Sequence, residues 1–205
     1  MSTSSDHVWV IGVTGASGVR YATRLLEVLP SLVKEVHVVF SDAALRVLHD
    51  EEGIAINPSA LSMERLTGKN AENVTFYNPR DIGARIASGS MLTTGMVVIP
   101  CSMATLGAIA HGIPSHLVHR AADVHMKEGR KLVVVPRETP LSPIHLENLL
   151  KLSRYGVKIV PAMPGFYHKP ETVQDMVDQF VMKVLDSMEV PNSMGSRWKE
   201  PGEAE

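Results

Sequence analysis

The chain has 205 residues, of which 44% are hydrophobic and 20% charged, so it can bury one sizeable core and is not an intrinsically disordered protein. Lys and Arg number 20 against 22 Asp and Glu, and the net charge of -2, with only 5% aromatic residues, argues against nucleic-acid binding. The single cysteine, Cys101, excludes an intramolecular disulfide and fits a reducing compartment.

Apolar runs rich in valine and isoleucine alternate with segments of helical periodicity along the chain. In chain order, the pattern predicts a strand over His7–Val13, a helix over Val19–Leu29, a strand over Val36–Phe40, a helix from Asp42, a short strand over Val74–Tyr77, a strand over Met96–Pro100 and a helix over Met103–His111. It continues with a helix over Ala121–Glu128, a strand over Leu132–Pro136, a helix over Pro143–Arg154, a strand over Val157–Val160 and a helix over Glu171–Met188.

This alternation of continuous apolar strands with helices is typical of a parallel sheet covered on both faces. We therefore predict an α/β fold with a single doubly wound, mostly parallel sheet, in a Rossmann-like three-layer sandwich. One domain should cover residues 1–190, and residues 191–205 form a polar C-terminal tail. Because ligands of such sheets bind at the carboxyl ends of the strands, the segments that directly follow each strand are the places to look for a site.

The stretch Ile86–His119 contains no Asp, Glu, Lys or Arg over 34 residues. A membrane span is the first interpretation, but Gly, Ser, Thr and Pro divide the stretch into pieces that are too short to cross a bilayer. We expect it instead to line a pocket or a contact between subunits. The amino-terminal segment also lacks the pattern of a signal peptide, so we expect a cytoplasmic protein.

The turn Thr14–Gly18 (TGASG) joins the first predicted strand to the first helix. Its small residues would let backbone N–H groups and the Ser17 hydroxyl approach a phosphate at the helix N-terminus, although a tight turn that binds nothing has the same pattern. The turn is neither a Walker A loop nor a G-x-G-x-x-G motif. Binding of a nicotinamide dinucleotide remains an alternative because Asp42 follows the second strand. The chain nevertheless lacks the Tyr-x-x-x-Lys pair that would serve as acid/base in such an oxidoreductase.

Arg137 and Glu138 directly follow the predicted strand Leu132–Pro136, at the edge where ligands bind. An arginine there can grip an anion bidentately, and a carboxylate beside cations can relay protons; a structural ion pair is the alternative. Cys101 is interpreted as a small buried hydrophobic residue rather than a nucleophile. The spacing His116-x-x-His119 resembles a metal site, but no complete metal-binding motif accompanies it, and we expect no metal.

Six segments, in this order, resemble the UbiX/Pad-type flavin prenyltransferases from about Val10 to Leu185. They are GVTGASG at the start, ASGS at Ala87–Ser90, PCSMATL at Pro100–Leu106, RAADV at Arg120–Val124, PRETPLSPIHLENLLKLS at Pro136–Ser153 and PGFYHKPET at Pro164–Thr172. The wordings KEGRK and SGS-x-x-T-x-GM are similar to the subgroup that is associated with aromatic-acid decarboxylases.

The resemblance implies a metal-independent prenyltransferase that transfers a dimethylallyl group from dimethylallyl monophosphate to reduced FMN. It implies a flavoprotein sandwich that assembles as a homododecamer built from trimers, with FMN bound where three subunits meet. The prenylated FMN would serve a UbiD-type decarboxylase partner. No membrane span and no nucleic acid are expected.

The resemblance also assigns site residues by position. The implied FMN contacts are Gly15, Ala16, Ser17, Ser41, Ser102, Met103, Ala104, Thr105 and Arg137. The implied clamp for the prenyl phosphate is Lys127, Arg137, Tyr167 and Lys183, with Ser90, Arg120 and Trp198 also on the substrate side. The implied catalytic residues are Glu138 as the acid/base, Ser17 near the flavin and Lys127, and Glu138 is expected to lie among Lys127, Arg137 and Lys183.

Three positions depart from the family pattern. Lys183 stands where several relatives have arginine, His125 replaces an aliphatic residue, and Gly129 replaces a basic residue. Lysine keeps the charge of arginine but loses its planar bidentate grip. The alternatives to a prenyltransferase are an FMN-dependent aromatic-acid decarboxylase, a non-enzymatic flavin carrier and, from a different class, a nicotinamide-dependent oxidoreductase.

Overall fold

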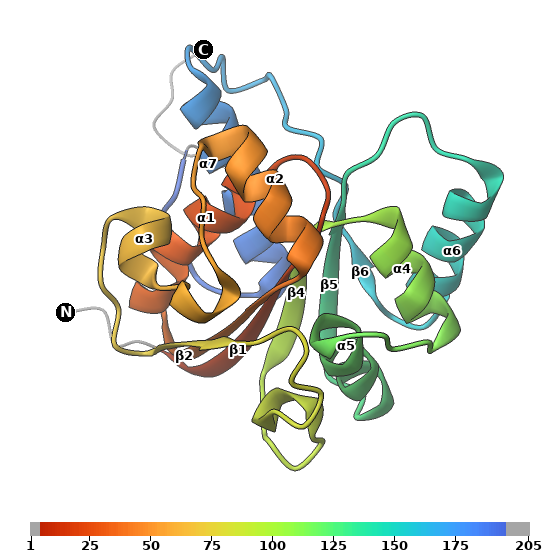
Figure 1. The fold of residues 1–205 in the computed structure, drawn as a ribbon. Helices are drawn as coiled ribbons and strands as arrows, with labels where there is room; N and C mark the ends of the chain where they lie inside the picture. The colour runs from red at the N-terminus through yellow and green to blue at the C-terminus, as the bar shows by residue number, and fades with distance from the viewer. Residues whose placement is uncertain (1–4, 196–205) are drawn as a thin grey trace.

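The computed structural model of the protein describes residues 5–195, and these residues form one six-stranded sheet between two layers of helices (Figure 1). Every strand runs parallel to its neighbours, and the strand order is β3-β2-β1-β4-β5-β6. The strands are β1 (Ser5–Val13), β2 (Val33–Phe40), β3 (Val74–Tyr77), β4 (Gly95–Cys101), β5 (Lys131–Pro136) and β6 (Lys158–Ile159). The expectation of a doubly wound parallel sheet is confirmed.

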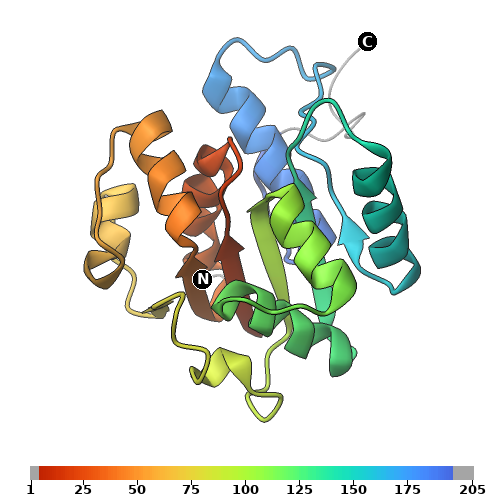
Figure 2. The ribbon, with the colours of Figure 1, turned by 45° about the vertical axis from the view of Figure 1, so that its right-hand side comes forward.

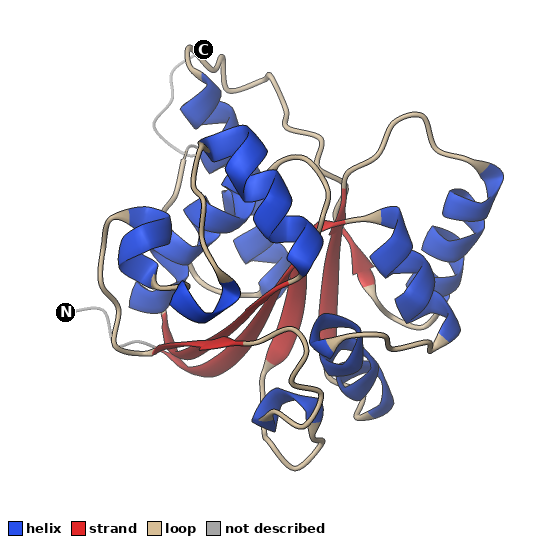
Figure 3. Ribbon diagram, in the orientation of Figure 1, coloured by secondary structure: helices blue, strands red, loops and turns tan. Residues whose placement is uncertain are grey.

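The helices divide between the two faces of the sheet, which lies between them as a red layer in Figure 3. They are α1 (Val19–Val28), α2 (Asp42–Glu52), α3 (Met63–Thr67), α4 (Met103–His111), α5 (Leu117–Lys127), α6 (Pro143–Arg154) and α7 (Val173–Met188). Buried residues of α1, α2, α3 and α7 share one core cluster, and those of α4, α5 and α6 share the other. Figure 2 shows α4, α5 and α6 on the same side of the strands.

Successive side chains of a strand point to opposite faces of the sheet, so each strand contributes to both cores. In β1, Trp9, Ile11 and Val13 pack with the first helical layer, whereas Val10 packs with the second. All four side chains are fully buried. This explains why the strand reads as a continuous apolar run instead of alternating with polar residues.

The chain changes direction of winding between β1 and β4. From β1 it proceeds outward to β2 and β3, and then it returns to the other side of β1 to form β4, β5 and β6. The loops that leave β1 and β4 therefore diverge to opposite faces of the sheet. A crevice at the carboxyl ends of these two strands is the position where doubly wound sheets bind their ligands.

Most predicted elements lie within a few residues of the observed ones, and the differences are local. Strand β2 begins at Val33, three residues before the prediction, because the polar pair Lys34 and Glu35 interrupts its apolar pattern. Helix α5 begins at Leu117, four residues early, and buries Leu117 and Val118 on the sheet. The short helix α3 was not predicted, since it lies in a segment with little hydrophobic periodicity.

The uncharged stretch Ile86–His119 forms β4, α4 and the start of α5. No helix within residues 5–195 combines the length and the apolar character needed to cross a bilayer. Part of the stretch lines the pocket described below, while Leu92 and Ile113 are largely exposed.

Three histidines are buried within the described chain: His37 on β2 and His119 and His125 on α5. Burial lowers the pKa of each ring, and the Arg130 guanidinium lowers the pKa of His125 further. The Nδ1 of His125 lies 2.7 Å from the Ala121 carbonyl, to which only an N–H can donate, so Nδ1 carries the proton of the neutral ring. Its Nε2 then accepts from the Thr93 hydroxyl at 2.8 Å.

We predict that acid destabilises the protein through these rings and that His125→Leu makes the acid loss smaller. The unfolded chain takes up protons below a pH of about 6.5, while the folded rings resist protonation, so the free energy of unfolding falls as the pH falls. At pH near 7.5 His125→Leu should cost roughly 1–3 kcal/mol, because the Thr93 hydroxyl loses the nitrogen that accepts its proton.

Denaturant midpoints between about pH 7.5 and pH 5, at one protein concentration, measure this effect. The matched control is His49→Leu, since His49 is exposed on α2. Equal acid losses in the wild type and in His125→Leu would show that His125 does not carry the pH dependence.

Candidate functional site

A pocket of about 430 Å³ lies at the carboxyl edge of the sheet, above β1, β2 and β4. Its volume is in the range of small-molecule sites. Five of the predicted cofactor contacts line it, namely Gly15, Ser41, Ser102, Ala104 and Thr105. The remaining lining residues are Asp42, Ala43, Pro79, Arg80, Ser115, His116 and His119. The sequence therefore located the pocket but missed the wall that the Pro79–Arg80 turn and the Ser115–His119 segment provide.

Thr14 joins the ends of β1 and β4 beneath this pocket. Its hydroxyl donates to the Pro100 carbonyl at 2.9 Å and accepts from the Ser102 backbone N–H at 2.8 Å, and its own N–H donates to Pro100 at 3.2 Å. The side chain is buried. These bonds hold the two diverging loops together at the point where the ladder between β1 and β4 has ended at Gly12 and Val98.

Two helices begin at the pocket, and each begins with a serine. Ser41 accepts from the Ala44 N–H at 3.1 Å as the cap of α2, and Ser102 accepts from the Thr105 N–H at 3.3 Å as the cap of α4. Helix N-termini carry partial positive charge, so their convergence favours an anionic group in the pocket.

The N-terminus of α1 is already occupied by a carboxylate, contrary to the expectation that a phosphate approaches it. Glu51, at the end of α2, accepts from the Gly18 N–H at 2.9 Å and from the Val19 N–H at 3.2 Å. An anion at the same N–H groups would meet this negative charge. No local pattern signals the contact, because Glu51 is 33 residues away from Gly18.

The turn Thr14–Gly18 nevertheless belongs to the same edge as the other predicted residues. Gly15 lines the pocket, and a side chain there would overlap the Cβ of Ala43. Ser17 is exposed, and its carbonyl accepts from Arg137 Nε at 3.2 Å. Among the predicted cofactor contacts outside the pocket wall, Ala16 is buried and Met103 is half-buried.

Arg137 and Glu138 follow β5 at the carboxyl edge, as predicted. Arg137 is half-buried and Glu138 is exposed, with one carboxylate oxygen accepting from the Thr139 N–H at 3.0 Å. Arg137 and Ser17 are thus brought together from residues 120 positions apart. The carboxylate of Glu138 stays open to any molecule that covers this edge.

A second group of predicted residues lies at the opposite end of the sheet, beside the amino ends of the strands. Lys127 ends α5, its amine lies 3.3 Å from Glu128, and Glu128 approaches Gly89 so closely that a side chain on Gly89 would overlap it. The neighbouring loop carries Ser90, whose hydroxyl is 2.8 Å from that of Ser88. The structure therefore brings Ser90 and Lys127 into one region.

Arg130 connects the loop to the turn that follows α5. Its guanidinium donates to the carbonyls of Gly89 and Met91 and lies 3.3 Å from the Thr93 hydroxyl, which also contacts His125. These contacts bring the two segments KEGRK and SGS-x-x-T-x-GM together in space. Neither Arg130 nor Thr93 was among the predicted site residues, although each belongs to one of those segments.

The other predicted substrate residues have partners within the chain. The Tyr167 hydroxyl accepts from Gln179 Nε2 at 2.6 Å, Lys183 lies 3.9 Å from Asp186, and Arg120 donates to Asp123 at 2.9 Å. Trp198 lies outside the described residues. The only cysteine, Cys101, is fully buried, and burial raises the pKa of its thiol, in agreement with a packing role.

One chain cannot place Lys127 beside Glu138. Lys127 precedes β5 and Glu138 follows it, so the six residues of the strand separate them by about 20 Å at roughly 3.3 Å per residue. The expected position of Glu138 among Lys127, Arg137 and Lys183 is therefore not formed within the chain. These residues can meet one small substrate only if copies of the chain pack together.

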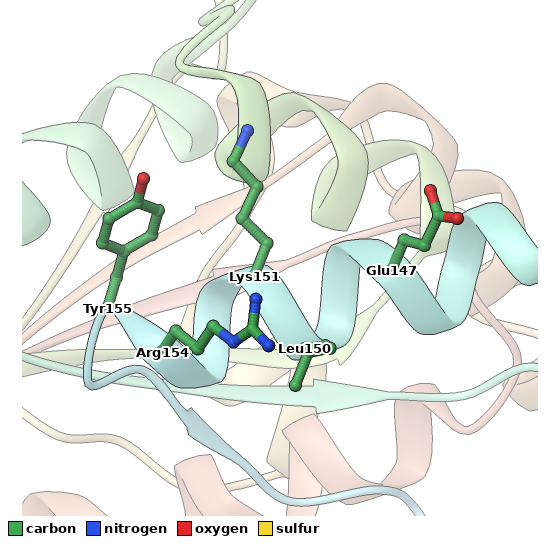
Figure 4. Close-up of a pocket in the computed structure, with 5 residues that line it drawn as sticks. All are labelled: Glu147, Leu150, Lys151, Arg154 and Tyr155. Carbon is green, nitrogen blue, oxygen red and sulfur yellow. The ribbon is translucent and has the colours of Figure 1, made fainter.

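Other hollows occur within the described chain, and one of about 370 Å³ gathers the polar side chains of His168, Lys169, Glu171, Asp175, Asp178 and Gln179. Figure 4 shows one of about 340 Å³ on α6, where Glu147, Leu150, Lys151 and Arg154 project from one helix beside Tyr155. Leu150 and Tyr155 are exposed apolar side chains, as is Ile144 on the same helix. No cluster of three or more potential metal ligands occurs within residues 5–195, and His116 and His119 stack with ring centroids 3.7 Å apart.

Comparison with known proteins places the chain in a defined group. Residues 1–185 match the flavoprotein family. Flavin prenyltransferase UbiX of Alkalihalophilus pseudofirmus is 44% identical over 200 residues, which is 98% of this chain and 100% of the relative.

Two solved structures are similar over nearly the whole chain. A dodecameric FMN-dependent UbiX-like decarboxylase from Escherichia coli O157:H7 has a TM-score of 0.84 and 45% identity, covering 94% of this chain and 100% of the other. AnUbiX (PadA1), in complex with FMN and dimethylallyl pyrophosphate, has a TM-score of 0.84 and 39% identity, covering 95% and 98%.

We predict that Arg130→Met loosens the loop of residues 88–94 without unfolding the protein. The substitution removes charged hydrogen bonds to two carbonyls, each worth about 1.5–3 kcal/mol, so amide hydrogen exchange in the loop should accelerate by roughly 10²–10⁴-fold. Arg46→Met is the control, because Arg46 is an exposed partner of Asp50. Unchanged exchange in the loop would show that Arg130 does not hold it.

Proposed function

The chain belongs to the flavoprotein family, among its UbiX-type flavin prenyltransferases, and from this membership we infer that it joins a dimethylallyl group to reduced FMN. The carbon–oxygen bond of dimethylallyl monophosphate breaks, inorganic phosphate leaves, and the prenyl carbon bonds to the flavin. The flavin supplies the nucleophilic ring, and the product is prenylated FMN. The carboxyl-edge pocket of about 430 Å³, with serine-capped helices at its wall, is the observation that supports this assignment in the chain itself.

The pocket fits FMN by its chemistry. The Ser41, Ser102 and Thr105 hydroxyls suit a phosphate, and the buried Nδ1 of His116 has no protein partner within the described residues. We propose that FMN is held by Gly15, Ala16, Ser17, Ser41, Ser102, Met103, Ala104, Thr105 and Arg137.

The leaving phosphate requires positive charge and hydrogen-bond donors. Enzymes that use prenyl diphosphates neutralise the leaving group with magnesium on Asp-rich motifs, and this sequence has no DDxxD motif. We propose that Lys127, Arg137, Tyr167 and Lys183 bind the phosphate, with Ser90, Arg120 and Trp198 on the side of the prenyl group. Donors fixed in place before the reaction stabilise the developing charge without reorganisation.

Glu138 is the proposed acid/base, with Ser17 beside the flavin. The Glu138 carboxylate is exposed at the edge where Arg137 contacts Ser17, so it can exchange protons with a bound substrate. Ring closure on the flavin releases a proton. A carboxylate at this position carries that proton to the departing phosphate. A positioned acid/base is worth about 10²–10⁴-fold in rate.

The complete site requires more than one chain, because Lys127 and Glu138 are held at opposite edges of the sheet. The related Escherichia coli protein is dodecameric, and we propose the same homododecamer of trimers here, with FMN bound where three subunits meet. The exposed apolar side chains of α6 and of the stretch Ile86–His119 offer surface for such contacts.

We propose that the product passes to a UbiD-type decarboxylase in the cytoplasm. The lone buried Cys101 suits a reducing compartment. A second candidate function is an FMN-dependent decarboxylase, which the name of the related Escherichia coli structure favours. A flavin carrier would need the FMN pocket alone, without a second set of cations for a prenyl phosphate.

We predict that the protein converts reduced FMN and dimethylallyl monophosphate to prenylated FMN. Anaerobic incubation followed by mass spectrometry should show a flavin whose mass has increased by one prenyl group. Dimethylallyl pyrophosphate is tested in parallel, because a related structure holds it. Binding of NAD without FMN would instead indicate the nicotinamide alternative.

Two results would contradict the assignment. Unmodified FMN after incubation with either donor would leave a carrier, and loss of carbon dioxide from an aromatic acid by this chain alone would identify a decarboxylase. Omitting the donor is the control, because the flavin mass must then stay unchanged.

A further inference from the structure

We propose that His119 is a positioning residue for the flavin phosphate, which acts by directing the hydrogen bond of the Thr105 hydroxyl into the pocket. The proposal rests on the proposed function, since it takes FMN as the occupant. The motif-like spacing His116-x-x-His119 thereby acquires a role that does not involve a metal.

His119 is buried at the wall of the pocket and contacts a neighbour through each ring nitrogen. Its Nδ1 lies 3.4 Å from the Ser115 backbone N–H and 3.0 Å from the Ser115 hydroxyl. Its Nε2 lies 3.2 Å from the Thr105 hydroxyl. The ring therefore bridges the loop before α5 to the first turn of α4.

These contacts fix which nitrogen carries the proton. A backbone N–H can only donate, so Nδ1 accepts from Ser115 and the proton of the neutral ring resides on Nε2. Burial, followed by the nearby His116, lowers the pKa of His119 to about 4, so the ring stays neutral near pH 7. Nε2–H consequently donates to Thr105.

Thr105 then has its own proton left to donate. Its oxygen accepts from His119 Nε2 and from the Ser102 hydroxyl at 3.2 Å, which uses both lone pairs. A hydroxyl in this state presents an O–H to a neighbouring acceptor, and Thr105 lines the pocket. A phosphate oxygen is the acceptor in FMN that best uses such a donor at the N-termini of α2 and α4.

The rings of His116 and His119 have centroids 3.7 Å apart, and both residues line the pocket. Without His119, the Thr105 hydroxyl can rotate and donate to Ser102 instead, so the phosphate loses a preset donor. The loss is expected in binding of the phosphate and not in binding of the flavin ring.

The test is a double-mutant cycle on the full-length protein, with dissociation constants for FMN and for riboflavin, which lacks the phosphate. His119→Leu and Thr105→Val should each weaken FMN binding by roughly 10–100-fold, the usual value of one hydrogen bond to a charged group. The double variant should bind FMN no more weakly than Thr105→Val, because His119 acts through Thr105. Riboflavin binding should change little in any of them.

Two further variants separate positioning from loss of structure. His119→Gln keeps an amide donor for Thr105 and should recover most of the FMN affinity. His111→Leu is the control on the same segment, since His111 is exposed at the end of α4, and it should bind FMN like the wild type. If His119→Leu does not assemble, His119→Asn takes its place. Its shorter amide should keep a contact with Ser115 but lose the hydrogen bond to Thr105.

Three outcomes would overturn the inference. They are additive effects in the double variant, an equal weakening of FMN binding and riboflavin binding, and a His119→Gln variant that binds FMN as weakly as His119→Leu. Normal FMN binding by His119→Leu would overturn it as well. Failure of the proposed function is distinguished from these outcomes, because it appears in the wild type as absent FMN binding or absent prenylated product.

Discussion

A parallel strand fixes the distance between its two ends, and β5 fixes the distance between the two halves of the proposed site. Lys127 and the loop of Ser90 lie before the strand, whereas Arg137 and Glu138 follow it. The strand is rigid because its residues Leu132–Pro136 are buried between two helical layers. No side-chain rotation closes a gap of about 20 Å, so a substrate that needs both groups must bind between copies of the chain.

Each half is stabilised by its own contacts, so both halves of the proposed site are ordered within a single chain. At the carboxyl edge, Thr14 bridges β1 to β4 and the serine caps orient two helices toward the pocket. At the amino edge, Arg130 binds the backbone of the Gly89–Thr93 loop. Preorganised halves of this kind limit the entropy cost of assembling a site between subunits.

The sequence predicted the sheet, its strands and the part of the pocket wall that follows β1, β2 and β4 from local patterns, because continuous apolar runs and glycine-rich turns are set by neighbours along the chain. It did not predict Glu51 at the N-terminus of α1 or Arg130 on the loop, since both depend on contacts across more than thirty residues. The histidine pair was noticed by its spacing but interpreted through metal chemistry. Its actual partners, Ser115 and Thr105, are recognisable only once α4 and α5 are packed.

The most direct test of a site shared between subunits is complementation between two inactive variants. Glu138→Gln and Lys127→Ala chains are assembled separately and as a random mixture, and prenylated FMN formation is measured. If the two residues act from different chains, about a quarter of the mixed sites contain both and activity returns to that level. A mixture no more active than the separate variants would contradict the account, because it would place both residues in the same chain's site.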